Sequence, residues 1–200
     1  MPALDSWPQF RGPTGDGIVA GQSPPTTFGE EQNLVWKTEL PGRAWSSPVI
    51  ADGVVWMTTA IERIPTADER IELLRQTNNS EKKFKQLAIA KSVELKVIAV
   101  DVASGQKLNE IDLVTIENPD AIHSLNSYAS PTPVIDGDRL YCHFGTFGTF
   151  AINRTNGEIV WQRTLPLQHA VGPGSSPLIH GERLILIQDG MDRQLSLIHI

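Results

Sequence analysis

Two histidines stand at matching places in the chain and raise the first chemical question. His123 lies a short distance before Pro133, and His169 lies a similar distance before Pro177. Two imidazoles at equivalent positions suggest a metal centre, in which both ring nitrogens lie about 2.0–2.1 Å from one ion. The sequence offers no third ligand beside them, so we predict no metal site. We expect these rings to bond loop backbone or to contact a ligand.

Further polar and aromatic side chains gather in the same kind of segment. Asn126 and Tyr128 follow His123, whereas Arg43 and Trp45 precede the first repeated strand. The alternative interpretation is that Asn126 and Ser127 satisfy backbone groups in a tight loop. The candidate residues for ligand or partner binding are Arg43, Trp45, His123, Asn126, Tyr128 and His169.

No catalytic residue is predicted. Ser46 and Ser47 have no visible general base, which a nucleophilic serine requires. The glycine-containing segment 145–149 neither opens a helix nor carries the Lys-Ser/Thr ending of a phosphate loop. Cys142 is the only cysteine, so an internal disulfide or a thiolate metal cage is excluded.

The composition excludes two classes of partner. The formal net charge is −6 and the basic residues form no extended cluster, so a nucleic-acid face is not predicted. No run of about 18 apolar residues exists, so no transmembrane segment is predicted. The N-terminus lacks the charged and apolar regions of a signal peptide.

A repeated segment supplies the elements that must position these residues. Residues 47–50, 132–135 and 176–179 each read Ser/Thr-Pro-Val/Leu-Ile, and each runs through a glycine-containing turn into a second apolar strand. Residues 97–109 align without gaps on residues 149–161, as a strand, a turn and a strand. A fixed internal period indicates a repeat architecture.

The length of one unit identifies the repeat. The second unit predicts four short strands that form an antiparallel meander, over about 132–136, 139–144, 148–153 and 158–164. The interval from Pro133 to Pro177 fits the length of one four-stranded propeller blade. We therefore predict an all-β protein, an incomplete β-propeller of four-stranded antiparallel blades.

The first blade carries a helical insertion. The interval from Pro48 to Pro133 is almost twice as long, but only one pair of outer strands lies within it, so the excess is assigned to an insertion over about 61–92. Residues 66–69 have capping-box spacing before one helical run, and Ser80 can cap a second run to Lys91. The basic cluster over 82–85 is interpreted as a solvated helix face, with a partner surface as the alternative.

These spacings give the predicted boundaries. The strand over 33–40 is expected to be the outer strand of the last blade, closing the ring by pairing with strands that are absent from this sequence. The last six residues resemble the translated end of a transposase sequencing adapter, so the natural sequence is expected to stop at Gln194. The predicted parts are a lead-in segment 1–32, a partial propeller 33–194 with blade 1 over about 45–113, blade 2 over about 129–165 and the start of blade 3 over about 175–194, and an adapter-derived tail 195–200.

Blade topology predicts which loops share a face. In an up-and-down blade, the loop between the second and third strands lies on the same side as the connection to the next blade. The insertion is such a loop, and the connections run over 41–47, 114–131 and 166–175. These segments hold all six candidate residues, so this face is the predicted binding surface.

The turns resemble a known family. Ala99-x-Asp101-x-x-Ser104-Gly105 and Ala151-x-Asn153-x-x-Asn156-Gly157-x-x-x-Trp161 resemble the repeat of pyrroloquinoline-quinone (PQQ)-like propellers. The segments 7–13, 126–133 and 172–177 are similar to a planctomycete-type subfamily of PQQ-binding-like repeat proteins. The resemblance implies a seven- or eight-bladed propeller in the full-length protein.

The resemblance also assigns structural roles. The family's tryptophan docks one blade on the next, and Trp36 and Trp161 match it, with Gly105 and Gly157 at the turns. Asn109 replaces the tryptophan in the first blade, which we expect to weaken docking there unless the insertion covers the gap.

Two functions are implied by resemblance. The favoured one is a non-catalytic scaffold that binds a protein or small ligand, similar to the outer-membrane assembly lipoprotein, with no cofactor. The alternative is a fragment of a PQQ- and calcium-dependent quinoprotein oxidoreductase, against which stands the lack of a Cys-Cys pair. The resemblance further implies a periplasmic or secreted protein that is monomeric when full length.

Overall fold

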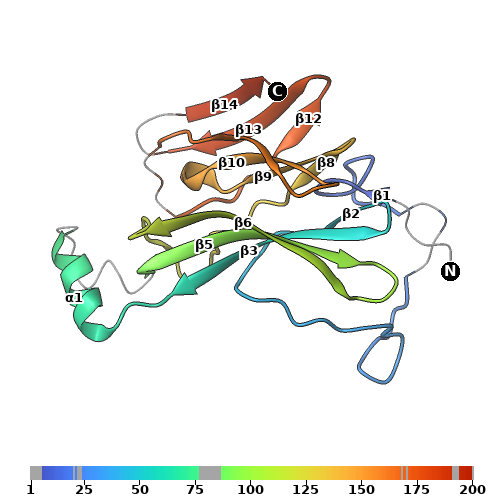
Figure 1. Ribbon diagram of the computed structural model, residues 1–200, viewed down its shortest axis with the longest axis horizontal. Coiled ribbons are helices and arrows are strands. Elements are labelled where there is room, and N and C mark those ends of the chain that lie inside the picture. Colours follow the sequence, from blue (N-terminus) through green and yellow to red (C-terminus); the bar gives the residue numbers. More distant parts are fainter. Residues whose placement is uncertain are drawn as a thin grey trace.

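The described residues form four antiparallel sheets, of which the three larger are stacked face to face. A computed structural model describes residues 6–19, 21, 24–76, 87–167, 169, 171–190 and 194–199. Figure 1 shows the third sheet above the second, and the second above the first. The architecture is an all-β, partial propeller, as predicted.

Each of the three larger sheets is one blade. Blade 1 contains β1 (Ser6–Trp7), β2 (Val49–Ala51), β3 (Val54–Arg63), β5 (Ser92–Asp101) and β6 (Lys107–Glu117), in that order. Blade 2 contains β8 (Val134–Asp136), β9 (Arg139–His143), β10 (Thr149–Asn153) and β11 (Ile159–Arg163), with the short 3-10 helix η1 (Gly145–Phe147) between β9 and β10. Blade 3 contains β12 (Leu178–His180), β13 (Arg183–Asp189) and β14 (Gln194–His199).

Burial follows the stacking of the blades. Strands β9 and β10 of the middle blade are buried on both faces, because blades 1 and 3 cover them. Strand β11 is largely exposed, as expected for the outer strand of a blade. The largest core cluster lies between blades 1 and 2, around Trp56, Leu95 and Phe150. A smaller cluster around Tyr141 and Leu184 lies between blades 2 and 3.

The insertion is shorter than predicted and contains one described helix. Strands β3 and β5 extend to Arg63 and from Ser92, and α1 (Ala67–Gln76) follows the predicted capping box. Its reciprocal hydrogen bonds join the Thr66 N–H to Glu69 Oε2 at 3.0 Å and the Glu69 N–H to Thr66 Oγ1 at 3.3 Å. The capping-box prediction is therefore confirmed.

The second predicted helix is wrong at its C-terminal end. Leu87 and Ala88 form strand β4 (Leu87–Ala88), which pairs with β7 (Ile122–His123) of the connection to blade 2. Pairing with a neighbouring strand satisfies the backbone groups that a helix would have satisfied internally. Residues 77–86, which include the basic cluster, lie outside the described residues.

The segment predicted as a strand over 33–40 runs beneath blade 1 without a hydrogen-bonded partner strand among the described residues (Figure 1). Its pairing with strands of the last blade stays a prediction. Trp36 packs on Gly105, and its indole Nε1–H donates to the Val102 carbonyl at 2.8 Å. A ladder needs a hydrogen-bonded neighbour, and blade 1 offers this segment its face rather than an edge.

Equivalent residues of the blades form matching cross-strand rows. In blade 2 the row ends Tyr141, Ala151, Trp161, whereas in blade 1 it ends Trp56, Ala99, Asn109. In this row, the tryptophan therefore lies on the outer strand of blade 2 but on the second strand of blade 1. Asn109 still lies over the next blade's turn, where a β-carbon on Gly157 would be 3.2 Å from its Nδ2.

The repeated Ser/Thr-Pro segments join the blades at their inner strands. The Ser47 N–H donates to Thr132 Oγ1 at 2.9 Å, and the Thr132 N–H donates to Ser176 Oγ at 3.0 Å. The hydroxyls of Thr132 and Ser176 therefore accept from the backbone of the preceding repeat. This contact gives a physical reason for the hydroxyl residue before the proline in the second and third repeats.

Candidate functional site

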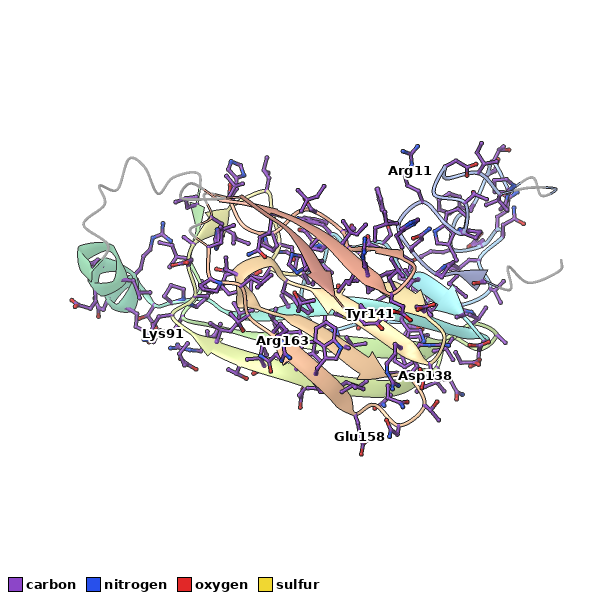
Figure 2. All side chains as sticks on the ribbon, turned by 90° about the horizontal axis from the view of Figure 1, so that it is seen from above. Arg11, Lys91, Asp138, Tyr141, Glu158 and Arg163 are labelled. Atoms are coloured by element: carbon purple, nitrogen blue, oxygen red, sulfur yellow. The ribbon has the colours of Figure 1, made fainter. Side chains whose placement is uncertain are left out.

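The three connections between blades lie against one another at one end of the molecule, which we call the loop face. It comprises the described residues of segments 41–47, 114–131 and 166–175 and of the insertion. Figure 2 shows Lys91, just before β5, at the end that carries α1, and Asp138, in a turn of blade 2, at the opposite end. The predicted separation of the two kinds of loop is therefore seen in the structure.

Hydrogen bonds connect these segments in series. The N–H groups of Trp45 and Ser46 donate to the Ala129 carbonyl at 3.3 and 3.2 Å. The Ser127 hydroxyl donates to the Arg43 carbonyl at 2.9 Å. The His123 N–H in turn donates to the Val171 carbonyl at 3.2 Å. The loop face is thus held by bonds between its segments rather than by each loop separately.

Asn126 is the centre of this network. Its Nδ2 donates to the carbonyls of Val171 at 2.8 Å and Pro173 at 3.0 Å. Its Oδ1 accepts from the Ser127 N–H and from the Ser130 hydroxyl. These four bonds use the full capacity of an amide. Asn126 therefore serves the loop structure, and no polar group of it is left for a ligand.

Tyr128 is inaccessible to a ligand in this structure. Its side chain is fully buried, its hydroxyl donates to the Asp120 carbonyl at 3.0 Å, and its ring meets Phe147 edge to face at 5.3 Å. Burial raises the pKa of its hydroxyl above the usual value. It belongs to the support of the loop face and not to its surface.

Trp45 lies at the surface, whereas Arg43 is only partly exposed and its guanidinium Nε and Nη2 are buried. The Arg43 guanidinium Nη2 lies 3.1 Å from Glu62 Oε1, an ion pair by distance that lacks hydrogen-bond geometry. The Trp45 side chain is 60% exposed although its backbone is hydrogen bonded. A partly exposed arginine and a largely exposed tryptophan therefore lie on the same short segment.

The two predicted loop histidines make equivalent backbone contacts. His123 Nδ1 accepts from the Leu125 N–H at 3.2 Å, and His169 Nδ1 accepts from the Gly172 N–H at 3.1 Å. Within the described residues, no group of three or more His, Cys, Asp or Glu side chains is placed to hold a metal ion. The described residues therefore do not assemble the acidic ligand set that a PQQ-bound calcium requires.

Sequence reasoning missed three exposed apolar residues of the loop face. Ile64 is 67% exposed, Leu125 80% and Val171 53%, each from a different segment. Their signal was a lone apolar residue within a polar loop, as in His123-Ser124-Leu125-Asn126. With Trp45 they place apolar side chains on four segments of one face.

Sequence reasoning also missed a cavity between blades 2 and 3 on the same face. It has a volume of about 230 Å³, and its lining includes His143, His169, Pro173, Ser175 and Gln188. His143 is buried, its Nδ1 lies 2.9 Å from Thr149 Oγ1, and burial lowers its pKa to about 4. Burial also lowers the pKa of His169, although the negative charge of Asp120 acts in the opposite direction and raises it.

A family profile decides the relationship. The profile described as outer membrane protein assembly factor BamB matches residues 28–166, which is more than half of the chain. The chain belongs to this family. The match covers blades 1 and 2 with the insertion, so the BamB-like assignment rests on the whole repeat and not on one motif.

Three solved structures are similar to this chain over part of their own length. BamB from Moraxella catarrhalis is 19% identical over 51% of this chain and 28% of its own, with a TM-score of 0.35. A quinohemoprotein alcohol dehydrogenase from Pseudomonas putida HK5 is 12% identical over 76% and 29%, with a TM-score of 0.31. A europium-containing methanol dehydrogenase is 12% identical over 69% and 27%, with a TM-score of 0.25.

The BamB-like chain spans 28% of the first of these structures. No curated protein matches it at a significant level. Among the described residues, no helix has the length and apolar character needed to cross a membrane. The planctomycete-type subfamily and the blade count of the full-length protein stay predictions.

Proposed function

We propose that the chain is part of a non-catalytic propeller whose loop face binds a protein partner. The observation that carries the proposal is the set of exposed apolar side chains Trp45, Ile64, Leu125 and Val171 on segments that hydrogen bonds hold together. Trp is among the residue types that dominate binding energy at protein interfaces, and Trp45 is 60% exposed. Tyr128 and Asn126 support this surface from within.

The family relationship supports a protein rather than a small molecule as the partner. The family description names a factor for outer membrane protein assembly. We accordingly propose a periplasmic or secreted location and a monomeric full-length protein that assembles with other proteins through the loop face. No catalytic step is assigned to any residue, and no cofactor is required for binding.

Site-specific photo-crosslinking in the cells that produce the protein tests this proposal. A benzophenone side chain at Leu125 should give one discrete protein adduct, and the Trp45→Ala change should remove most of it. The matched control is a benzophenone at Leu108, which is 55% exposed at the start of β6, next to a turn of the opposite face. Equal adducts at both positions, or none at Leu125, would contradict the proposal.

A cofactor titration tests the non-catalytic part separately. PQQ added with Ca²⁺ should leave the quinone absorbance unchanged in the presence of the full chain. Saturable, stoichiometric binding together with alcohol-dependent dye reduction would favour the quinoprotein alternative instead.

A further inference from the structure

Two buried polar atoms of the cavity between blades 2 and 3 have no hydrogen-bond partner among the described residues. They are His169 Nε2 and Gln188 Oε1, and both side chains line the cavity. The His169 side chain is 8% exposed and Gln188 is 6% exposed, so solvent hardly reaches either. A buried polar atom without a hydrogen bond costs about 1–3 kcal/mol in general, so an occupant that satisfies both is favoured.

The neighbouring hydrogen bonds fix the roles of the two atoms. His169 Nδ1 accepts from the Gly172 N–H, so the neutral ring carries its proton on Nε2, which is a donor. The nearest carboxylate oxygen, Asp120 Oδ2, is 4.0 Å away, beyond hydrogen-bond distance. Gln188 Nε2 donates to the Leu165 carbonyl at 3.2 Å, which leaves Oε1 as an acceptor. The unpaired buried atoms that line the cavity are therefore one donor and one acceptor, and no lining residue is Asp, Glu, Lys or Arg.

We propose that this cavity binds the primary amide of an Asn or Gln side chain that a partner protein inserts. The amide carbonyl accepts from His169 Nε2, and the amide N–H donates to Gln188 Oε1. A volume of about 230 Å³ exceeds what one water needs and suits a side chain of this size. A carboxylate would lose its hydration here without a counter-charge, which disfavours it. This inference rests on the proposed function for the identity of the molecule that supplies the amide.

Titration of the full chain with propionamide, followed by NMR of the histidine side chains, tests the chemistry without a partner. Propionamide should shift the His169 ring signals in a saturable manner, whereas sodium propionate and 1-propanol at equal concentration should not. Equal shifts with 1-propanol would show that the site takes hydroxyls, and no saturable shift would show that it holds only water. Either result overturns the inference.

Two variants test the named atoms. His169→Asn keeps an acceptor for the Gly172 N–H but removes the Nε2 donor, and Gln188→Met keeps the volume but removes the acceptor. Each should weaken propionamide binding about tenfold. His123→Asn is the matched control, since His123 makes the same kind of backbone contact outside the cavity. Because the two changes lie on different segments, unfolding of one variant leaves the other informative.

The crosslinking assay separates this inference from the proposed function. In the Gln188→Met variant the Leu125 adduct should decrease. An unchanged adduct would overturn the partner's amide as the occupant while the loop face stands as a binding surface. No adduct in any variant, with selective propionamide binding intact, would contradict the proposed function and also remove the protein source of the amide.

Discussion

His143 is a buried base whose protonation opposes folding. Its pKa is lowered to about 4 by burial from an ordinary value of 6.5. The unfolded chain therefore binds a proton between these two values while the folded chain does not. The stability that the neutral ring contributes is complete above about pH 6.5 and is lost as the pH falls toward 4.

The lowered pKa of His143 predicts a loss of stability at acid pH. Between pH 7 and pH 4 the free energy of unfolding should fall by about 2–3 kcal/mol through this group, because the two pKa values differ. Urea denaturation of the wild type and of His143→Gln at several pH values measures it. The variant should show a flatter pH dependence, and an identical slope in both proteins would contradict the assignment. His180, on β12 and outside the core, provides the control variant His180→Gln.

Two turns of blade 1 have a glycine with positive φ but differ in whether a side chain packs on it. Gly105 has φ +72° and a β-carbon on it would lie 2.5 Å from Trp36 Cδ2, whereas Gly53 has φ +74° and open space around it. The two positions therefore share a backbone conformation and differ only in the docking contact. This difference isolates the contact experimentally.

Substitution of the two turn glycines should therefore lower stability by different amounts. Gly53→Ala should lower the free energy of unfolding by about 1–2 kcal/mol through its positive φ alone. Gly105→Ala should lower it by about 1–3 kcal/mol more, because the methyl group displaces the indole. Chemical denaturation of both variants measures the difference. Equal losses would mean that Trp36 does not depend on a bare turn.

The blades differ in how far their neighbours cover them. Blade 2 is buried on both faces between blades 1 and 3. Among the residues whose burial the structure describes, the cluster that joins blades 1 and 2 is larger than the cluster that joins blades 2 and 3. Repeat proteins gain stability from each interface separately and open locally where the interface is weak. Blade 3 should therefore open without the other two.

Hydrogen exchange followed by mass spectrometry tests this prediction at the molecular scale. Peptides from β12 and β13 should exchange through openings of lower free energy than peptides from β5, β9 and β10. Uniform protection across all three blades would show one cooperative unit and would contradict the prediction.

The fold could be predicted from the sequence because its signals are local. The Ser/Thr-Pro repeats, the glycine turns and the capping box before α1 each specify backbone geometry within a few residues. The helix expected up to Lys91 was wrong because strand β4 pairs with β7, and no local pattern reports that pairing. The pairing expected for residues 33–40 involves strands of the last blade and stays a prediction.

The sequence alone determined the repeat, the blade, the face on which the connecting loops lie and the set of residues on those loops. Which of these residues are accessible to a partner or ligand depends on the tertiary fold. It buried Tyr128, satisfied Asn126 in full and left Trp45 exposed. It also brought His169 and Gln188, from separate segments, to one cavity. Exposure and unpaired polar atoms depend on contacts between residues far apart in the chain, which residue types and spacing do not encode.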